Sequence, residues 1–181
     1  MKRKHIALQT PPVLCPLCGG EQAIARKAAD PVSGDLFTII RCCRCGVGIT
    51  RPAPADLAPY YPAAYYGSRH GATSGLCLRR RLRLLPTTPG SLLDVGCGDG
   101  SFLVAARSRG WCVTGLERAP DAARAHGITI HTTTADFVGC GFDAITLWHS
   151  LEHFPDPLQL LQQLTGLLNP NGVIIIAVPN F

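Results

Sequence analysis

Long hydrophobic runs are absent from this chain of 181 residues, and charged residues make up only 16% of it. No apolar run reaches the about 20 residues needed for a helix to span a bilayer. The basic start at Lys2, Arg3 and Lys4 has no apolar signal core behind it. We therefore expect a cytoplasmic protein without a membrane partner, with room for one ordinary domain and a small module.

Cysteine, by contrast, is abundant, with nine residues in the chain. Four of them form two Cys-x-x-Cys pairs, Cys15 with Cys18 and Cys42 with Cys45, and glycine follows each pair. In a cytoplasmic chain such pairs indicate metal binding before disulfides. A redox-active pair is the alternative. Because four thiolates can surround one tetrahedral ion, we predict a structural Zn²⁺ site.

The predicted zinc-binding module covers residues 1–52, and a connector rich in proline and alanine follows over 53–90. The arginine-rich stretch 76–85 is expected to be helical, and its arginines form either a solvated face or a phosphate-binding patch. The connector also holds every tyrosine of the chain: Tyr60, Tyr61, Tyr65 and Tyr66. These side chains either line a substrate pocket or pack the connector onto the main domain.

From residue 91 onward, segments of strand and helix composition alternate. This alternation predicts an α/β fold, a doubly wound and mostly parallel Rossmann-like sheet over 91–181. Strands are expected at 92–95, 112–116, 128–132, 142–147 and 173–178, helices at 100–109, from 120 and at 157–168, and a turn at 169–172.

The last expected strand, 173–178, is apolar on both faces, as in a strand buried inside a sheet. Only three residues follow it, so the strand would otherwise form a hydrophobic edge that is prone to aggregation. We therefore expect a missing C-terminal segment of this protein, or another chain, to cover this edge.

A glycine-rich turn with Gly96 and Gly98 follows the first of these strands and precedes a helix. Glu117 ends the next strand, where an acid can bind ribose hydroxyls, so the pattern nearly fits a dinucleotide site. However, Asp94 and Asp99 flank the turn, and carboxylates disfavour a pyrophosphate. The charges favour S-adenosyl-L-methionine (SAM), whose ammonium and sulfonium are cationic.

The sequence from Asp94 to Gly100, an acid at the end of the second strand, and the sequence Leu-Glu-His-Phe-Pro-Asp-Pro at 151–157 resemble the class I SAM-dependent methyltransferases. The resemblance implies that Gly96 and Gly98 pass under the methionine part of SAM. It also implies that Asp94 supports the glycine turn or the ammonium of SAM.

The same resemblance implies a place for the rest of the cofactor. Glu117 would accept hydrogen bonds from both ribose hydroxyls, Asp136 and Phe137 would contact adenine, and His149 would lie beside the methionine moiety and the transferred methyl group. The family sheet has seven strands and this sequence reaches the fifth, which supports truncation of the chain.

The cysteine pairs followed by a tyrosine-containing connector resemble the sugar C-methyltransferases that act on nucleotide-linked deoxyketosugars. That likeness implies that the four tyrosines and His153 line the acceptor site. His153 is the best candidate for a general base, because histidine titrates near neutral pH. Its alternative role is to cap or pack at the start of the following helix.

Three functions fit the sequence. The first is SAM-dependent methyl transfer to a small-molecule acceptor, such as a nucleotide-linked sugar. The second is an RNA methyltransferase that grips phosphate with the zinc module and the arginine cluster, although the segment after the fourth strand lacks the Asn/Asp-Pro-Pro-aromatic signature of many base-amine methyltransferases. The third is a truncated, non-catalytic fragment that binds a cofactor or a partner.

Overall fold

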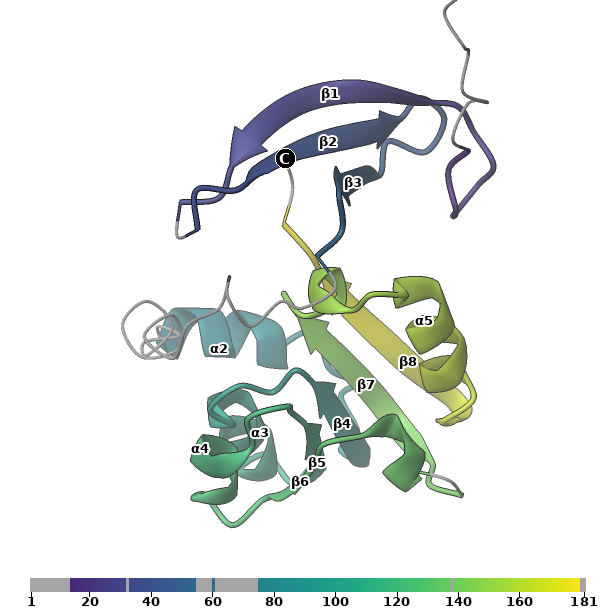
Figure 1. The fold of residues 1–181 in the computed structure, drawn as a ribbon. Coiled ribbons are helices and arrows are strands. Elements are labelled where there is room, and N and C mark those ends of the chain that lie inside the picture. Colours follow the sequence, from purple (N-terminus) through teal and green to yellow (C-terminus); the bar gives the residue numbers. More distant parts are fainter. Residues whose placement is uncertain (1–13, 32, 55–59, 61–74, 138, 180–181) are drawn as a thin grey trace, which may run out of the picture. The chain divides into compact units, whose positions relative to one another are not determined.

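A computed structural model of the protein describes residues 14–31, 33–54, 60, 75–137 and 139–179 (Figure 1). The chain divides into two compact units, one up to Tyr60 and one from Tyr61 to Asn180. In the described part of the chain, no helix has the length and apolar character that a membrane crossing requires.

The N-terminal unit is built on a three-stranded antiparallel sheet of β1 (Gln22–Ala29), β2 (Leu36–Cys42) and β3 (Gly48–Arg51). The turn between β1 and β2 is held by the amide of Ser33, which donates to the Asp30 carboxylate at 2.8 Å. Only cysteines, Cys15 and Cys42, are buried among the apolar residues described in this unit. So small a core leaves the folding of the unit dependent on the cysteine cluster.

The C-terminal unit is a five-stranded parallel sheet in the order β6-β5-β4-β7-β8. This Rossmann-like arrangement confirms the predicted fold class and the predicted order of strands and helices along the chain. The strands are β4 (Ser91–Val95), β5 (Cys112–Leu116), β6 (Thr129–His131), β7 (Phe142–Trp148) and β8 (Leu168–Ala177). The helices are α2 (Gly75–Leu82), α3 (Ser101–Arg107), α4 (Asp121–Arg124) and α5 (Pro157–Thr165), with short 3₁₀ helices η2 (Thr134–Phe137) and η3 (Leu151–His153).

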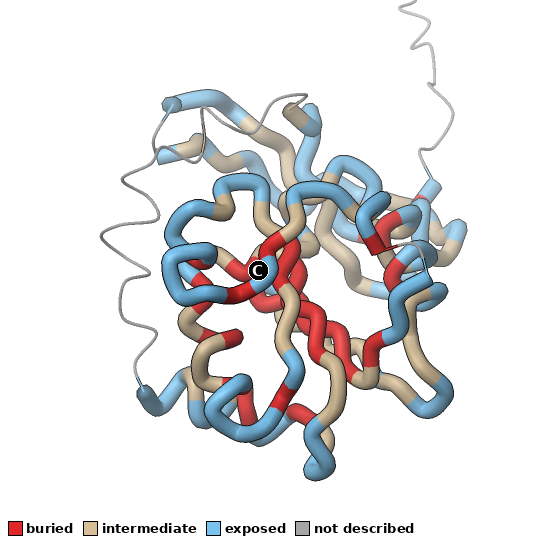
Figure 2. Tube along the Cα trace, turned by 90° about the horizontal axis from the view of Figure 1, so that it is seen from below, coloured by how far each residue is buried: buried red, intermediate tan, exposed pale blue. Residues whose placement is uncertain are grey.

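Helices pack on both faces of the sheet, and the core forms two clusters. Figure 2 shows the buried residues gathered in the interior of the C-terminal unit, with exposed residues around them. Side chains of a strand alternate between the two faces. Leu92 of β4 therefore packs with Phe102 and Leu103 of α3, whereas Leu93 packs with Leu160 and Leu164 of α5. A central strand apolar on both faces is thus a direct consequence of its place between two layers of helices.

The turn predicted at 169–172 falls inside β8, which already begins at Leu168, and Asn171 in it has a positive φ of 67°. Leu168 pairs with Phe142, but the next pair is Ala144 with Val173, so the intervening residues bulge out of the ladder. The Asn169 side-chain amide donates to the Asp143 carboxylate at 2.9 Å and holds this bulge. The turn-forming residues therefore make an irregularity inside a strand.

The described strand β8 lies at one end of the sheet order, as expected. Its large apolar side chains are partly exposed there, Val173 at 36% and Ile176 at 43%. The sequence-based expectation that a further segment or another chain covers this edge remains a prediction.

Replacing Asp143 with alanine should lower the melting temperature of the C-terminal unit. The Asp143 carboxylate accepts hydrogen bonds from the amide and hydroxyl of Ser91 and from Asn169, which joins the start of β4, β7 and β8. These bonds, that of Asn169 first, lower the pKa of Asp143 below 3.8. Their stabilisation is therefore present above pH 3.8 and is lost as the pH falls through the lowered pKa.

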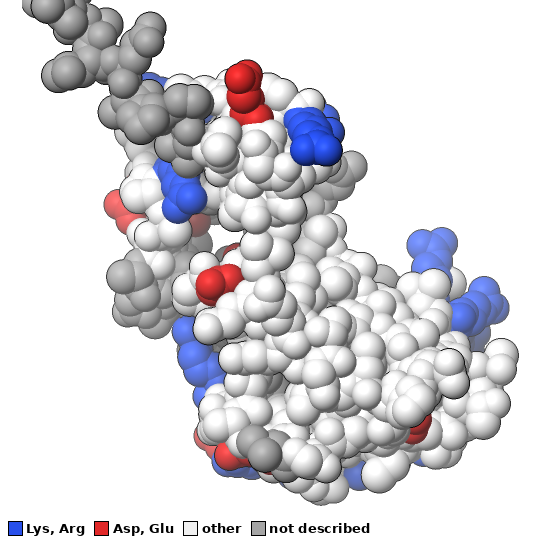
Figure 3. All heavy atoms as spheres, turned by 90° about the vertical axis from the view of Figure 1, so that its right-hand side faces the viewer, with Lys and Arg blue, Asp and Glu red and all other residues white. Residues whose placement is uncertain are grey.

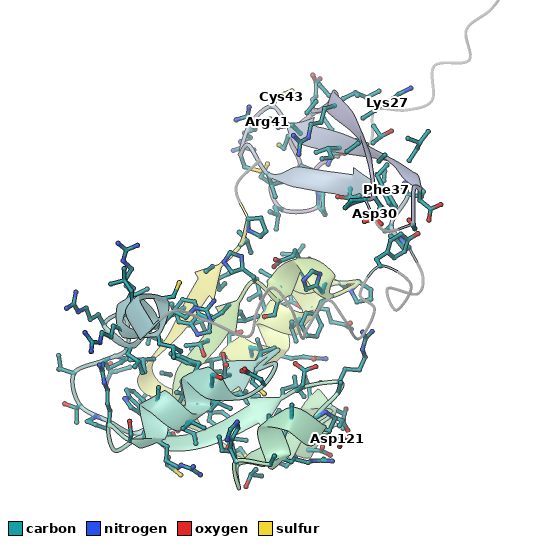
Figure 4. All side chains as sticks on the ribbon, turned by 90° about the vertical axis from the view of Figure 1, so that its left-hand side faces the viewer. Lys27, Asp30, Phe37, Arg41, Cys43 and Asp121 are labelled. Atoms are coloured by element: carbon teal, nitrogen blue, oxygen red, sulfur yellow. The ribbon has the colours of Figure 1, made fainter. Side chains whose placement is uncertain are left out.

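The melting temperature of Asp143→Ala and of the wild type should be measured by tryptophan fluorescence from pH 2 to 7. The difference between the two should be largest near pH 7 and should shrink in acid. Asp121→Ala, which removes an exposed carboxylate of α4 (Figure 4), is the control. A gap between wild type and Asp143→Ala that does not change with pH would contradict the assignment.

Candidate functional site

The thiols of Cys15, Cys18, Cys42 and Cys45 converge at one end of the N-terminal unit. Their sulfur atoms all lie within 4.8 Å of one another. Cys15 Sγ is 3.7 Å from Cys45 Sγ, and Cys18 Sγ is 3.5 Å from Cys42 Sγ. Sulfurs bound at about 2.3 Å around one tetrahedral Zn²⁺ would lie about 3.8 Å apart. The donor set and its spacing therefore fit a structural zinc ion.

Two turns of similar geometry present these thiols. The amide of Gly19 donates to the carbonyl of Cys15 at 2.8 Å, and the amide of Gly46 donates to the carbonyl of Cys42 at 3.1 Å. Each turn thus folds back on the first cysteine of its pair. This repetition brings two pairs that are distant in the sequence to one point, as their spacing predicted.

Backbone amides also stabilise a thiolate in the second turn. The amides of Cys45 and Arg44 each lie 3.4 Å from Cys42 Sγ. These hydrogen bonds, that of Cys45 first, lower the pKa of Cys42 to about 6. A thiolate is the form that binds zinc. Cys43, labelled in Figure 4, is exposed and lies outside the cluster.

Substituting Cys42 with serine should abolish zinc binding, whereas Cys43→Ser should leave it unchanged. The purified wild type should carry one zinc ion per chain, as measured by atomic emission spectrometry. Because the described core of this unit is so small, chelation should also unfold β1–β3, which amide hydrogen exchange would detect. Equal zinc content in both variants would contradict the site.

The glycine-rich turn lies at the carboxyl end of β4, beside the end of β5. The amide of Gly96 donates to the carbonyl of Leu116 at 2.7 Å, and the amide of Gly98 donates to the Glu117 carboxylate at 2.9 Å. A Cβ atom on Gly96 would lie 2.5 Å from the Cβ of Ser150, whereas one on Gly98 would meet nothing within 4 Å. The turn is therefore packed on one side and open at Gly98.

Asp94 is buried directly below this turn. Its carboxyl oxygen Oδ1 accepts a hydrogen bond from the Thr146 hydroxyl at 2.7 Å. Burial raises the pKa of Asp94 to about 7, which the Thr146 hydrogen bond and the charge of Arg81 oppose. Glu117 lies at the same edge, where its carboxylate also accepts from the amide of Ala119 at 3.1 Å. The structure thus brings the predicted acids and glycines together.

The predicted adenine-binding residues lie in η2, after β6. The Asp136 carboxylate is exposed and lies 3.2 Å from His131 Nδ1. The Phe137 ring is only 1% exposed, and it contacts His131 and Phe142 edge-on. A role for Phe137 at the adenine face therefore remains a prediction. At this position the exposed group is the Asp136 carboxylate, and the His131 ring beside it is half-buried.

His131 was not identified from the sequence. Its carbonyl accepts from the amide of Glu117 at 2.9 Å, which places it beside the predicted ribose-binding acid. Its position at the end of β6 was the available signal, because parallel strands end at one edge of the sheet.

The segment after β7 forms the facing side of the site. His149 is exposed, has a positive φ of 55° and donates its amide to the carbonyl of Ala177 at 2.9 Å. The Ser150 hydroxyl, also missed from the sequence, donates to the carbonyl of Val95 at 2.6 Å. His153 lies in η3, and burial lowers its pKa, which the Glu152 carboxylate 4.0 Å away opposes. A neutral imidazole is therefore favoured at neutral pH.

Of the four predicted acceptor-site tyrosines, Tyr60 belongs to the N-terminal unit. Its hydroxyl donates to the Asp35 carboxylate at 2.8 Å, and its ring packs edge-on against Phe37 of β2. Phe37 is labelled in Figure 4. The other predicted tyrosines, Tyr61, Tyr65 and Tyr66, lie outside the described residues. An acceptor role for all four remains a prediction.

Charged side chains are few and scattered on the face of the molecule drawn in Figure 3. On α2, the side chains of Arg79 and Arg80 are exposed and that of Arg81 is half-buried. The arginines that the sequence groups together therefore lie in different environments: two are solvated and one is partly packed against the protein.

Replacing Asp94 with asparagine should remove a pH dependence from the stability of the C-terminal unit. The raised pKa means that protonated Asp94 favours the folded state below pH 3.8, and that this contribution is lost as the pH rises towards about 7. The wild type should lose a few kcal/mol relative to Asp94→Asn over this range.

Urea unfolding followed by tryptophan fluorescence at stepped pH is the measurement. Asp99→Asn, which changes an exposed carboxyl of the same turn, should keep the wild-type pH dependence. If Asp94→Asn also kept it, the buried carboxyl would not be the titrating group.

Known proteins resemble the C-terminal part of the chain most clearly. The protein family described as "Methyltransferase domain" matches residues 69–181. The ubiquinone biosynthesis O-methyltransferase of Actinobacillus pleuropneumoniae is 41% identical over 106 residues, which cover 49% of this chain and 45% of that protein. The corresponding protein of Xanthomonas campestris is 34% identical over 107 residues. The chain spans about half the length of the curated relatives it matches.

Solved structures show the same likeness. The sugar N-methyltransferase KedS8 from Streptoalloteichus superposes with a TM-score of 0.53 at 26% identity, over 74% of this chain and 59% of that one. An amino pentose methyltransferase from Micromonospora echinaspora with bound SAM has a TM-score of 0.50 at 24% identity, over 71% of this chain and 59% of that one, and shares the fold.

Proposed function

The chain belongs to the methyltransferase domain family, and from this we propose that its C-terminal unit binds SAM and transfers the methyl group to a small molecule. The observation that carries the proposal is the pair of acids around an open glycine turn, Asp94 below it and Glu117 beside it. This arrangement suits a cationic nucleoside better than a pyrophosphate.

Glu117 is proposed to hold the ribose. Each of its oxygens accepts one backbone amide, from Gly98 and from Ala119. A carboxylate offers about four lone-pair positions, so two hydroxyls can be accepted in addition. The amides fix the orientation of the carboxylate before a ligand arrives, which reduces the ordering cost of binding.

The methionine half of the cofactor is proposed to lie over Gly96 and Gly98, with Asp94 near its ammonium and His149 beside the methyl group. SAM supplies an electrophilic methyl group on a sulfonium. The protein residues then have to orient the acceptor in line with it and exclude water.

His153 is proposed as the group that takes a proton from the acceptor. Burial lowers its pKa, so the imidazole is available as a neutral base at neutral pH. The ring is about a third exposed, at 35%, which leaves it accessible to an acceptor.

For the acceptor, we propose a nucleotide-linked sugar. The match to the sugar N-methyltransferase covers 74% of this chain. This is more than the part that matches the methyltransferase family, residues 69–181, so the structural likeness extends into the N-terminal half. The curated relatives named as ubiquinone biosynthesis O-methyltransferases match only about half of the chain. Their name makes a hydroxyl group of a small molecule the competing acceptor.

Calorimetric titration tests the cofactor. S-adenosylhomocysteine (SAH), the product form, should bind, whereas NAD should not. Glu117→Gln should weaken SAH binding about tenfold or more, because a hydrogen bond to a charged group contributes about 1.5–3 kcal/mol. Asp121→Asn, at an exposed position of α4, should bind SAH like the wild type.

Binding of NAD without binding of SAH would overturn the proposal. Titration of the SAH complex with a nucleotide-linked ketosugar, a catechol and single-stranded RNA separates the acceptor classes. RNA binding that weakens steeply with salt would favour the RNA methyltransferase instead.

A further inference from the structure

Two arginines line a hollow on the surface of the N-terminal unit. The hollow has a volume of about 700 Å³, and Arg41 and Arg44 line it together with Cys42 and Cys45 of the cysteine cluster. No acidic residue is among the described residues that line it. Arg41 and the exposed Cys43 lie together at this end of the unit (Figure 4). The hollow thus combines two positive charges with two of the four clustered thiols.

Arg44 connects the two cysteine turns. It lies in the second turn, between Cys42 and Cys45, and its guanidinium Nη1 donates to the carbonyl oxygen of Cys18 in the first turn at 3.1 Å. Its backbone amide lies 3.4 Å from Cys42 Sγ. One residue therefore contacts the first turn through its side chain and the second turn through its main chain.

The base of the Arg44 side chain lies beside the clustered sulfurs. A Cβ atom on Gly20 would lie 2.7 Å from Arg44 Cβ, 3.1 Å from Cys42 Sγ and 3.3 Å from Cys18 Sγ. These three atoms therefore surround one point, which glycine leaves empty. Because the side chain is packed at its base and hydrogen-bonded at its tip, its guanidinium has a defined position although the residue is exposed.

The charge of the metal site indicates what the arginines do. A thiol gives up its proton when it binds zinc, so four thiolates around one Zn²⁺ form a doubly negative cluster. Two guanidinium groups that line the same hollow offset this charge. A phosphate from outside would compete with thiolates that are always in place, and it would meet little net positive charge.

We propose that Arg44 is a positioning residue of the zinc site, which ties the two cysteine turns together through the Cys18 carbonyl and, with Arg41, offsets the negative charge of the zinc–thiolate cluster. The inference rests on the four-cysteine site and is independent of the proposed methyl transfer. Groups beyond the metal ligands orient those ligands, and their removal typically weakens metal binding about 10–100-fold.

The zinc affinity of the full chain, measured at low ionic strength by competition with a chromogenic chelator, tests the proposal. Arg44→Gln should weaken zinc binding about tenfold or more, because it removes a charge and a hydrogen bond. Arg44→Lys keeps the charge and should recover part of the loss. Arg26→Gln, which removes an exposed positive charge of β1 outside the hollow, is the matched control and should bind zinc like the wild type.

Salt separates the charge from the hydrogen bond. At about 1 M salt the Debye length falls to about 3 Å, so the affinity difference between the wild type and Arg44→Gln should narrow. Arg41→Gln is a second variant, in which the charge alone is expected to matter. It should weaken zinc binding several-fold at low ionic strength and have little effect at about 1 M salt.

Equal zinc affinity of the wild type and Arg44→Gln would overturn the proposal. A loss that neither salt nor Arg44→Lys reduces would overturn it as well, because the charge would then play no part. Single-stranded RNA that binds the zinc-loaded wild type, and that Arg44→Gln no longer binds, would show that the arginine serves an outside phosphate instead. A wild type that binds no zinc would refute the four-cysteine site itself, and this inference with it.

Discussion

A carboxyl group buried between two central strands is the constraint on which the C-terminal unit depends. Asp94 tolerates burial because Thr146 of the adjacent strand β7 donates a hydrogen bond to it at 2.7 Å. This bond joins β4 to β7 directly below the glycine turn, where the strand order reverses. The same bond holds a carboxyl group, whose pKa burial raises to about 7, at the place proposed for the cationic end of the cofactor. The hydrogen bond between Thr146 and Asp94 therefore contributes both to the stability of the sheet and to the geometry of the candidate site.

Much of this fold could be predicted because its signals are local. Apolar runs of strand length, separated by helix-length segments, gave the correct order of β4 to β8, and the cysteine spacing identified the four converging thiols. The bulge after Leu168 could not be predicted. Asparagine, proline and glycine indicate a turn locally, but the contact of Asn169 with Asp143 keeps the segment in the sheet. That contact joins residues far apart in the sequence.

The candidate site likewise contains residues that the sequence predicted and residues that it did not. Asp94, Gly96, Gly98 and Glu117 stand at strand ends, so their convergence followed from strand alternation. Arg81, whose charge acts on Asp94, gave no such signal, because an arginine among four arginines is expected on a solvated face. Only the packing of α2 against the end of β7, where its guanidinium carbon lies 5.1 Å from the centroid of the Trp148 ring, separates it from the rest. Contacts between side chains that are brought together only by helix packing could therefore not be predicted from the sequence.

The left-handed backbone at His149 limits which side chains this position of the chain accepts without strain. Asparagine, aspartate, histidine and glycine adopt a positive φ more readily than other residues, whereas β-branched side chains resist it. The exposed position next to the proposed methyl group therefore favours glycine or one of these short polar residues. Substitutions meant to change the acceptor would therefore be accommodated with less strain at neighbouring positions than at His149.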